Sequence, residues 1–90
     1  MHEMHAFIDI FVESSLMDQV VEALAKVPDV EELYEVTGEF DIIVLVYAKG
    51  IEELRDILNN RILKIPGIKS TVSSIVLKAH KGPKCETSDR

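Results

Sequence analysis

The same helix-ending segment occurs twice in the chain, and this repeat constrains the fold more than any other feature of the sequence. Residues 26–30 are KVPDV and residues 64–68 are KIPGI, so the two copies lie 38 positions apart. In each copy a proline ends a predicted helix, because proline disfavours helical backbone at the residue before it. A strand is predicted to follow each proline. The chain therefore contains one strand–helix–strand unit that is written twice.

The first unit begins with a strict alternation of side-chain character. Every second residue between positions 4 and 13 is apolar, which predicts a strand. The apolar residues 16, 20, 24 and 27 then follow helical spacing, and Ser15 with Asp18 predicts a cap for that helix. A short and more polar strand is predicted over residues 30–36.

The second unit repeats this order with a more apolar strand. Residues 40–48 are apolar on both faces and predict the third strand. Gly50 precedes a second helix, and residues 68–79 are predicted as the fourth strand. The apolar spacing in the second helix predicts a buried stripe of Ile51, Leu54, Leu58, Ile62 and Ile65.

Two such units with right-handed crossovers, joined by a hairpin, predict an α+β, ferredoxin-like βαββαβ fold. Its four antiparallel strands form one sheet, both helices cover one face, and the first and third strands are central. We predict a single domain over residues 1–79. Residues 80–90 are rich in Lys, Gly, Pro, Ser and Asp, and we predict a polar C-terminal tail or a frayed edge segment there.

The sheet face opposite the helices, called the open face below, is predicted to be unusually apolar. We expect Ala6, Ile8, Ile10 and Val12, with Phe40, Ile42, Val44 and Val46, to face the helices. The open face of a half-covered antiparallel sheet is normally polar, and monomers rarely expose large apolar patches. We therefore expect two sheets to pair face to face in a dimer. The interface residues would be Phe7, Phe11, Ile43, Leu45 and Tyr47.

The charge balance argues against nucleic acid as a direct partner. Ten Lys and Arg residues against sixteen Asp and Glu residues give a net charge of −6, whereas a nucleic-acid-binding face needs a basic stripe. The longest uncharged apolar run is far shorter than the ~20 residues of a membrane span. The single cysteine suits a reducing compartment. We expect a cytoplasmic protein that contacts neither nucleic acid nor membrane.

No set of residues predicts catalysis or metal binding. The histidines and the cysteine lack a compact ligand spacing, and the serine pairs lack a nucleophile elbow or an interior histidine base. We therefore expect no enzyme, no metal and no cofactor. Two alternatives remain: a small dimeric α/β-barrel enzyme of the monooxygenase or isomerase type, and a purely structural oligomerisation module. The residues considered for metal binding or catalysis are His2, His5, His80, Cys85, Ser14, Ser15, Ser73 and Ser74.

The segment VTGEFD at residues 36–41 is the most informative in the chain. Gly38 suits the positive φ of a hairpin turn. Asp41 follows beside the apolar open face, where an unpaired carboxylate is costly. Either Asp41 accepts backbone N–H groups at the turn, or it binds a cation; the residues alone leave both roles open.

Together with this segment, IPGI at residues 65–68 and STVSSIVL at residues 70–77 complete a resemblance to a known family. About residues 4–79 resemble the effector domain, or RAM domain, of the Lrp/AsnC regulators. The resemblance implies a ferredoxin-like fold, face-to-face dimers that assemble further into tetramers or octamers, and amino acids bound between dimers. The family's helix-turn-helix DNA-binding domain precedes this region and is not in the sequence. We therefore expect a stand-alone effector domain.

The resemblance also implies where the effector binds and what the domain does. An amino-acid effector would place its ammonium at Asp41 and its carboxylate on backbone or hydroxyl donors. We expect a non-enzymatic regulatory module that influences transcription through partners such as full-length Lrp/AsnC regulators. The implied ligand positions are Thr37, Gly38, Glu39, Phe40, Asp41, Thr71, Ser73, Ser74, Ile75 and Val76.

Overall fold

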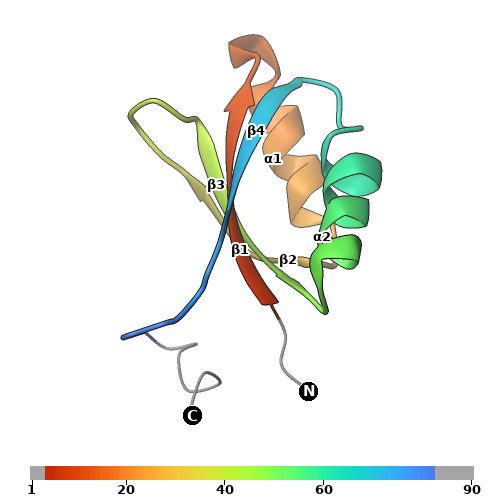
Figure 1. The fold of residues 1–90 in the computed structure, drawn as a ribbon. Coiled ribbons are helices and arrows are strands. Elements are labelled where there is room, and N and C mark those ends of the chain that lie inside the picture. The colour runs from red at the N-terminus through yellow and green to blue at the C-terminus, as the bar shows by residue number, and fades with distance from the viewer. Residues whose placement is uncertain (1–3, 83–90) are drawn as a thin grey trace.

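The computed structural model describes residues 4–82 and confirms the βαββαβ order (Figure 1). The elements are β1 (Met4–Val12), the 3₁₀ turn η1 (Ser14–Leu16), α1 (Met17–Ala25), β2 (Val30–Glu35), β3 (Ile42–Ala48), α2 (Ile51–Ile57), the π-helical turn η2 (Leu58–Ile62) and β4 (Ile68–Ile75). Residues 1–3 and 83–90 lie outside the described part of the chain, and so does most of the predicted C-terminal tail.

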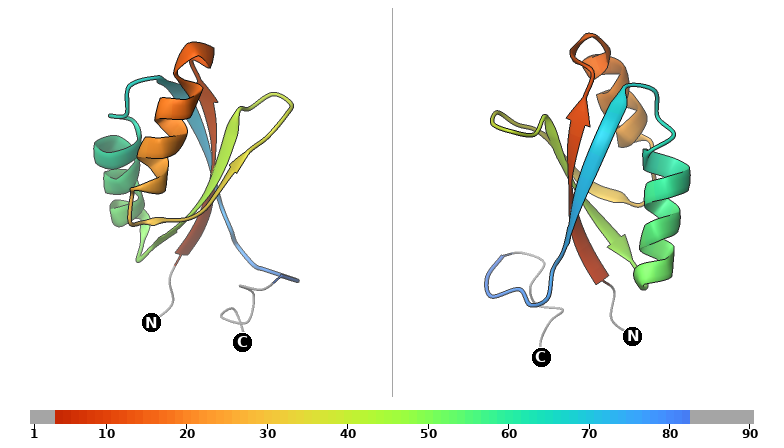
Figure 2. Two further views of the ribbon diagram at one scale, coloured as in Figure 1. Left: turned by 180° about the vertical axis from the view of Figure 1, so that it is seen from behind. Right: turned by 45° about the horizontal axis from the view of Figure 1, so that its top comes forward.

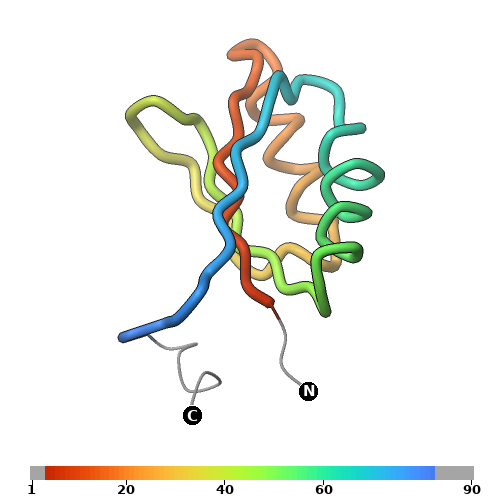
Figure 3. Tube along the Cα trace, in the orientation of Figure 1, coloured from red at the N-terminus to blue at the C-terminus, as the bar shows by residue number. Residues whose placement is uncertain are grey.

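The four strands form one antiparallel sheet in the order β2-β3-β1-β4, with the two most apolar strands in the centre. Both helices lie on the same face, and no helix or strand of residues 4–82 covers the other face (Figure 2). The connection between β2 and β3 projects as a long hairpin beyond the body of the sheet (Figure 3). The predicted ferredoxin-like architecture is therefore confirmed.

The core lies between the sheet and the two helices. The predicted inward residues Ala6, Ile8, Ile10 and Val12 of β1 are all buried. The even-numbered residues of β3 from Ile42 to Ala48 are buried against them, and Val20 and Leu24 of α1 close the core from the helix side. Burial of aliphatic side chains in this layer is the main favourable contribution to folding.

The repeat seen in the sequence extends to the backbone hydrogen bonds. Val30 N–H donates to Val27 O at 3.1 Å after the first helix, and Ile68 N–H donates to Ile65 O at 3.3 Å after the second. An ion pair between Arg61 and Asp29 joins the two halves at these turns. Each proline segment therefore ends its helix and starts the next strand through the same turn.

Two strands are shorter than predicted. β3 starts at Ile42 instead of residue 40, because residues 36–41 form the hairpin turn. β4 ends at Ile75 instead of residue 79, because the chain turns away from β1 after Val76 donates its N–H to His5 O.

The helices differ from prediction in two details. The predicted Ser15–Asp18 cap is wrong: the residue before α1 is Leu16, and no side-chain hydrogen bond caps the helix. The predicted stripe is wrong at Ile51, which is 51% exposed, and it missed the buried Ile57. The π turn over Leu58–Ile62 explains the second error, because its wider turn places residues 57 and 62 on one side. No helix within residues 4–82 is long and apolar enough to cross a membrane.

Candidate functional site

The hairpin turn at residues 36–41 is closed by its own backbone. Val36 N–H donates to Asp41 O at 3.0 Å. Gly38 has a φ of +119°, and a Cβ there would meet nothing within 4 Å. The glycine is therefore required by backbone conformation and not by a close neighbour. Thr37, Gly38 and Glu39 are exposed at the tip of the hairpin.

Asp41 extends the hydrogen-bond ladder between β3 and β1. Its N–H donates to Ile10 O at 3.0 Å, and its Oδ2 accepts from Val12 N–H at 2.8 Å. A side-chain carboxylate oxygen is thus the acceptor for the N–H at the last residue of β1. Of the two roles left open by the sequence, the structure shows acceptance of a backbone donor.

Phe40 lies on the other side of the sheet from its predicted position. Its ring packs against Phe11, with 4.8 Å between the ring centroids and 50° between their planes. Phe40 is half-buried and is not part of the core cluster. The prediction that it faces the helices is wrong, because the alternation of β3 does not extend into the turn.

The structure brings only part of the implied ligand set together. Asp41 and Thr71 lie at the same end of β1, since Asp41 N–H bonds Ile10 O and Thr71 pairs with Ile10. Ile75 pairs with Ala6, four residues away along β1, which is about 13 Å at ~3.3 Å per residue. Within one chain, Ser74, Ile75 and Val76 therefore lie far from the turn, while Ser73 pairs with Ile8 midway between.

The open face is less uniformly exposed than predicted. Phe7 is 40% exposed and Tyr34 more than half exposed, while Phe11, Ile43 and Tyr47 are half-buried. Leu45 is only 4% exposed, so its predicted exposure on this face is wrong within the single chain. The chain after β4 passes beside this end of the open face, where Val76 and residues 78–82 line one cavity with Leu45.

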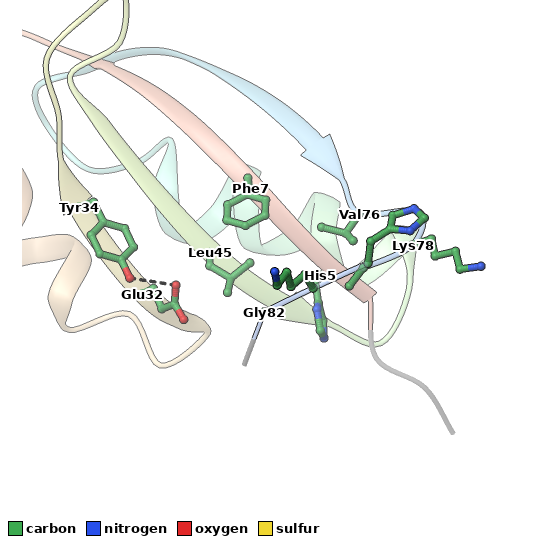
Figure 4. A pocket seen from close by; sticks show the side chains of 11 residues that line it. His5, Phe7, Glu32, Tyr34, Leu45, Val76, Lys78 and Gly82 are labelled. Atoms are coloured by element: carbon green, nitrogen blue, oxygen red, sulfur yellow. Dashed lines mark hydrogen bonds between the residues drawn. The ribbon is translucent and has the colours of Figure 1, made fainter. Parts of the chain in front are cut away.

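A cavity of about 540 Å³ lies where that segment meets the open face (Figure 4). Its apolar floor consists of Phe7, Leu45 and Val76. Polar groups stand around this floor, and the Lys78 side chain points away from Leu45. The cavity has the size of a small-molecule site. The remaining lining residues are His5, Glu32, Tyr34, Lys78, Ala79, His80, Lys81 and Gly82.

One hydrogen bond and one ring contact involve side chains at the rim of this cavity. The Tyr34 hydroxyl donates to the Glu32 carboxylate at 3.1 Å. This hydrogen bond, together with the negative charge of Glu32, raises the pKa of Tyr34 above its ordinary value. The His5 ring stacks on Tyr47 at 4.3 Å between centroids. The sequence analysis missed Glu32 and Tyr34 as site residues, although their even positions on β2 share the parity that faces this side.

No group of three or more His, Cys, Asp or Glu side chains suited to a metal ion occurs within residues 4–82. Of the residues considered for metal binding, His2 and Cys85 lie outside the described residues. His5 and His80 both line the cavity.

A family model described as the Lrp/AsnC ligand binding domain matches residues 5–84. The chain belongs to the Lrp/AsnC family. The HTH-type transcriptional regulator FL11 of Pyrococcus horikoshii is 41% identical to it over 80 residues, which are 89% of this chain and 52% of that protein. The chain thus spans about half the length of the curated regulators that it matches first. Homocitrate synthase of Sulfurisphaera tokodaii is 39% identical over 74 residues, 81% of this chain but 16% of the enzyme.

Solved structures agree with this assignment. The protein TTHA0845 of Thermus thermophilus is 33% identical with a TM-score of 0.81, and the match covers 88% of this chain and 99% of that one. A feast or famine regulatory protein of Mycobacterium tuberculosis, solved in complex with L-methionine, is 28% identical with a TM-score of 0.77. That match covers 90% of this Lrp/AsnC chain and 54% of the other.

Proposed function

We propose that this chain is a non-enzymatic regulatory domain that binds an amino acid or a related small metabolite. The observation that carries the proposal is the match of residues 5–84 to the Lrp/AsnC ligand binding domain. The L-methionine complex of the mycobacterial relative supports an amino-acid effector. The regulators among the relatives support a role in transcription, exerted through partner regulators of the same family.

The effector site that we propose lies between copies of the chain. A free amino acid has one ammonium and one carboxylate a few ångströms apart. The turn at residues 37–41 and the far end of β4 are separated by about 13 Å along the strands of one chain. One amino acid therefore contacts both groups only if the turn comes from one copy and residues 74–76 from another. In such a site the second carboxylate oxygen of Asp41 faces the ammonium, and Ser73 or Ser74 donates to the carboxylate.

The open face supports pairing of two copies face to face. Phe7 and Val72 on this face are 40% and 47% exposed, and Phe11, Ile43 and Tyr47 are half-buried beside them. A second sheet laid on this face would remove these side chains from water, at a gain of roughly 25 cal/mol per Å² of apolar surface. The cavity floor around Leu45 would be enclosed by the same contact.

A thermal-shift screen of the common amino acids tests the effector proposal. Binding to the native state alone adds about 2.7 kcal/mol at a hundred times the dissociation constant. We expect one or a few amino acids to raise the melting temperature of the wild type. The same amino acids should fail to shift Asp41→Asn relative to its own ligand-free value, and should still shift Glu39→Gln. The absence of any shift at millimolar concentration would overturn the proposal.

A further inference from the structure

The cavity beside Leu45 lies apart from the hairpin turn at which we place the ammonium of the effector. Its floor includes Phe7 of β1 and Leu45 of β3, which pair with each other. The hairpin turn meets the other end of β1, where the Phe40 ring packs on Phe11. Four residues of β1 separate Phe7 from Phe11, which is about 13 Å at ~3.3 Å per residue. Of the implied ligand positions, only Val76 lines the cavity.

The cavity has more positive than negative charge, although the chain is acidic. Lys78 and Lys81 line it, and residues 76–82, which carry these lysines, contain no Asp or Glu. Among the described lining residues Glu32 is the one carboxylate, and it accepts a hydrogen bond from Tyr34. Neither lysine forms an ion pair with a residue in the described range 4–82. Two cations without a partner in a chain of net charge −6 favour an anionic ligand at this place.

The uncharged surface of the cavity is apolar and aromatic. Phe7 is 40% exposed and Tyr34 is 53% exposed, and both rings line the cavity together with Val76 (Figure 4). Aromatic rings bind other rings through offset stacking or edge-to-face contacts. The volume of about 540 Å³ lies within the range of pockets that bind small molecules. A ligand that suits these walls has an aromatic body and an anionic group.

We propose that this cavity binds an aromatic monocarboxylate, with its ring against Phe7 and Tyr34 and its carboxylate at Lys81. The Lys78 side chain points away from Leu45 and provides a second cation at the rim (Figure 4). A second carboxylate on the ligand would be repelled by Glu32. An α-ammonium group would bring a third cation to a cavity that already has two. The site therefore favours a carboxylic acid over the amino acid of the same carbon skeleton.

Titration of the full chain with 3-phenylpropanoate, followed through the methyl signals of Leu45 and Val76 by NMR, tests the proposal. This acid and L-phenylalanine have the same carbon skeleton and differ in the α-ammonium group. We expect 3-phenylpropanoate to shift both methyl signals to saturation at millimolar concentration. L-phenylalanine should bind at these methyl groups about tenfold more weakly. The neutral 3-phenylpropanamide should also bind more weakly, because it has no negative charge.

Charge reversal at Lys81 tests the position of the carboxylate. Lys81→Glu replaces an attraction by a repulsion and should raise the dissociation constant of 3-phenylpropanoate by roughly tenfold. Lys64→Glu is the matched control, because Lys64 is also exposed and does not line the cavity. It should change the dissociation constant by less than about twofold. A second variant, Tyr34→Ala, removes an exposed ring and should also weaken binding.

Asp41→Asn separates this site from the proposed effector site. This variant should lose its response to amino acids and still bind 3-phenylpropanoate with the dissociation constant of the wild type. The proposal is overturned if the wild type shows no saturable shift at Leu45 and Val76, or if L-phenylalanine binds there as tightly as 3-phenylpropanoate. Unchanged binding in Lys81→Glu would overturn it as well. So would loss of binding in Asp41→Asn, because the ligand would then occupy the effector site.

Discussion

At the scale of single residues, Asp41 is the side chain whose structural role is most clearly defined. Its Oδ2 accepts the partly buried N–H of Val12 at 2.8 Å. In Asp41→Ala this donor has no acceptor, and leaving a buried donor unsatisfied costs about 1–3 kcal/mol. We expect a lower free energy of unfolding by this amount in urea denaturation. Asp41→Asn keeps an acceptor oxygen and should lose less.

Glu39→Ala is the matched control for this prediction. Glu39 lies two residues away in the same turn and is exposed, and substitutions at such positions usually change stability by less than about 0.5 kcal/mol. Equal stability of Asp41→Ala and Glu39→Ala would show that the Val12 hydrogen bond contributes nothing.

Two glycines in the sequence motifs, Gly38 and Gly67, are required for different physical reasons. Gly38 has open space around it and is required only by its φ. Gly67 has a φ of +104°, and a Cβ there would lie 2.8 Å from Val20 Cγ2 and 2.9 Å from Leu16 Cβ. The sequence shows both as turn glycines, and the hairpin at Gly38 was predicted. The close approach at Gly67 depends on how α1 packs on the turn, which local sequence does not encode.

At the scale of elements, the second helix gives the sharpest test. The structure buries Ile57 at 1% exposure and leaves Ile51 at 51%. Truncation of a buried isoleucine costs about 2–5 kcal/mol through lost transfer energy and a cavity. We therefore expect Ile57→Ala to lower the free energy of unfolding by this amount. Ile51→Ala should change it by less than about 0.5 kcal/mol, as is usual at exposed positions.

The uniform 3.6-residue period predicts the opposite order, since it includes Ile51 in the buried stripe and omits Ile57. A larger loss in Ile51→Ala than in Ile57→Ala, measured by urea denaturation, would contradict the structure. The 3.6-residue period correctly predicted that Leu54 and Ile62 are buried. It failed at Ile57, which directly precedes the π turn, because a pattern of apolar positions contains no sign of which hydrogen bonds the backbone makes.

At the scale of the whole molecule, the sequence predicted the strand order and the face covered by helices. The repeat of KVPDV and KIPGI and the apolar character of β1 and β3 were sufficient for this. The candidate site was predicted less well. The implied ligand residues were predicted as one group, but the register of the sheet separates Asp41 from Ile75. Register depends on pairings between segments that are distant in the sequence. The cavity near Leu45 depends on the path of residues 76–82, for which the sequence has no periodic pattern.

The last prediction concerns the proposed face-to-face dimer. Phe7 is 40% exposed on the open face, so we expect Phe7→Lys to leave the single chain folded. It places a charge where a second sheet would cover it, and an unpaired buried charge is strongly destabilising. Leu63→Lys is the matched control, because Leu63 is 42% exposed just after η2 on the helix side. By light scattering at micromolar concentration, Phe7→Lys should have half the wild-type mass and Leu63→Lys the wild-type mass.

A wild type that is monomeric at micromolar concentration would contradict the face-to-face dimer, because nothing would then cover the exposed apolar side chains of the open face.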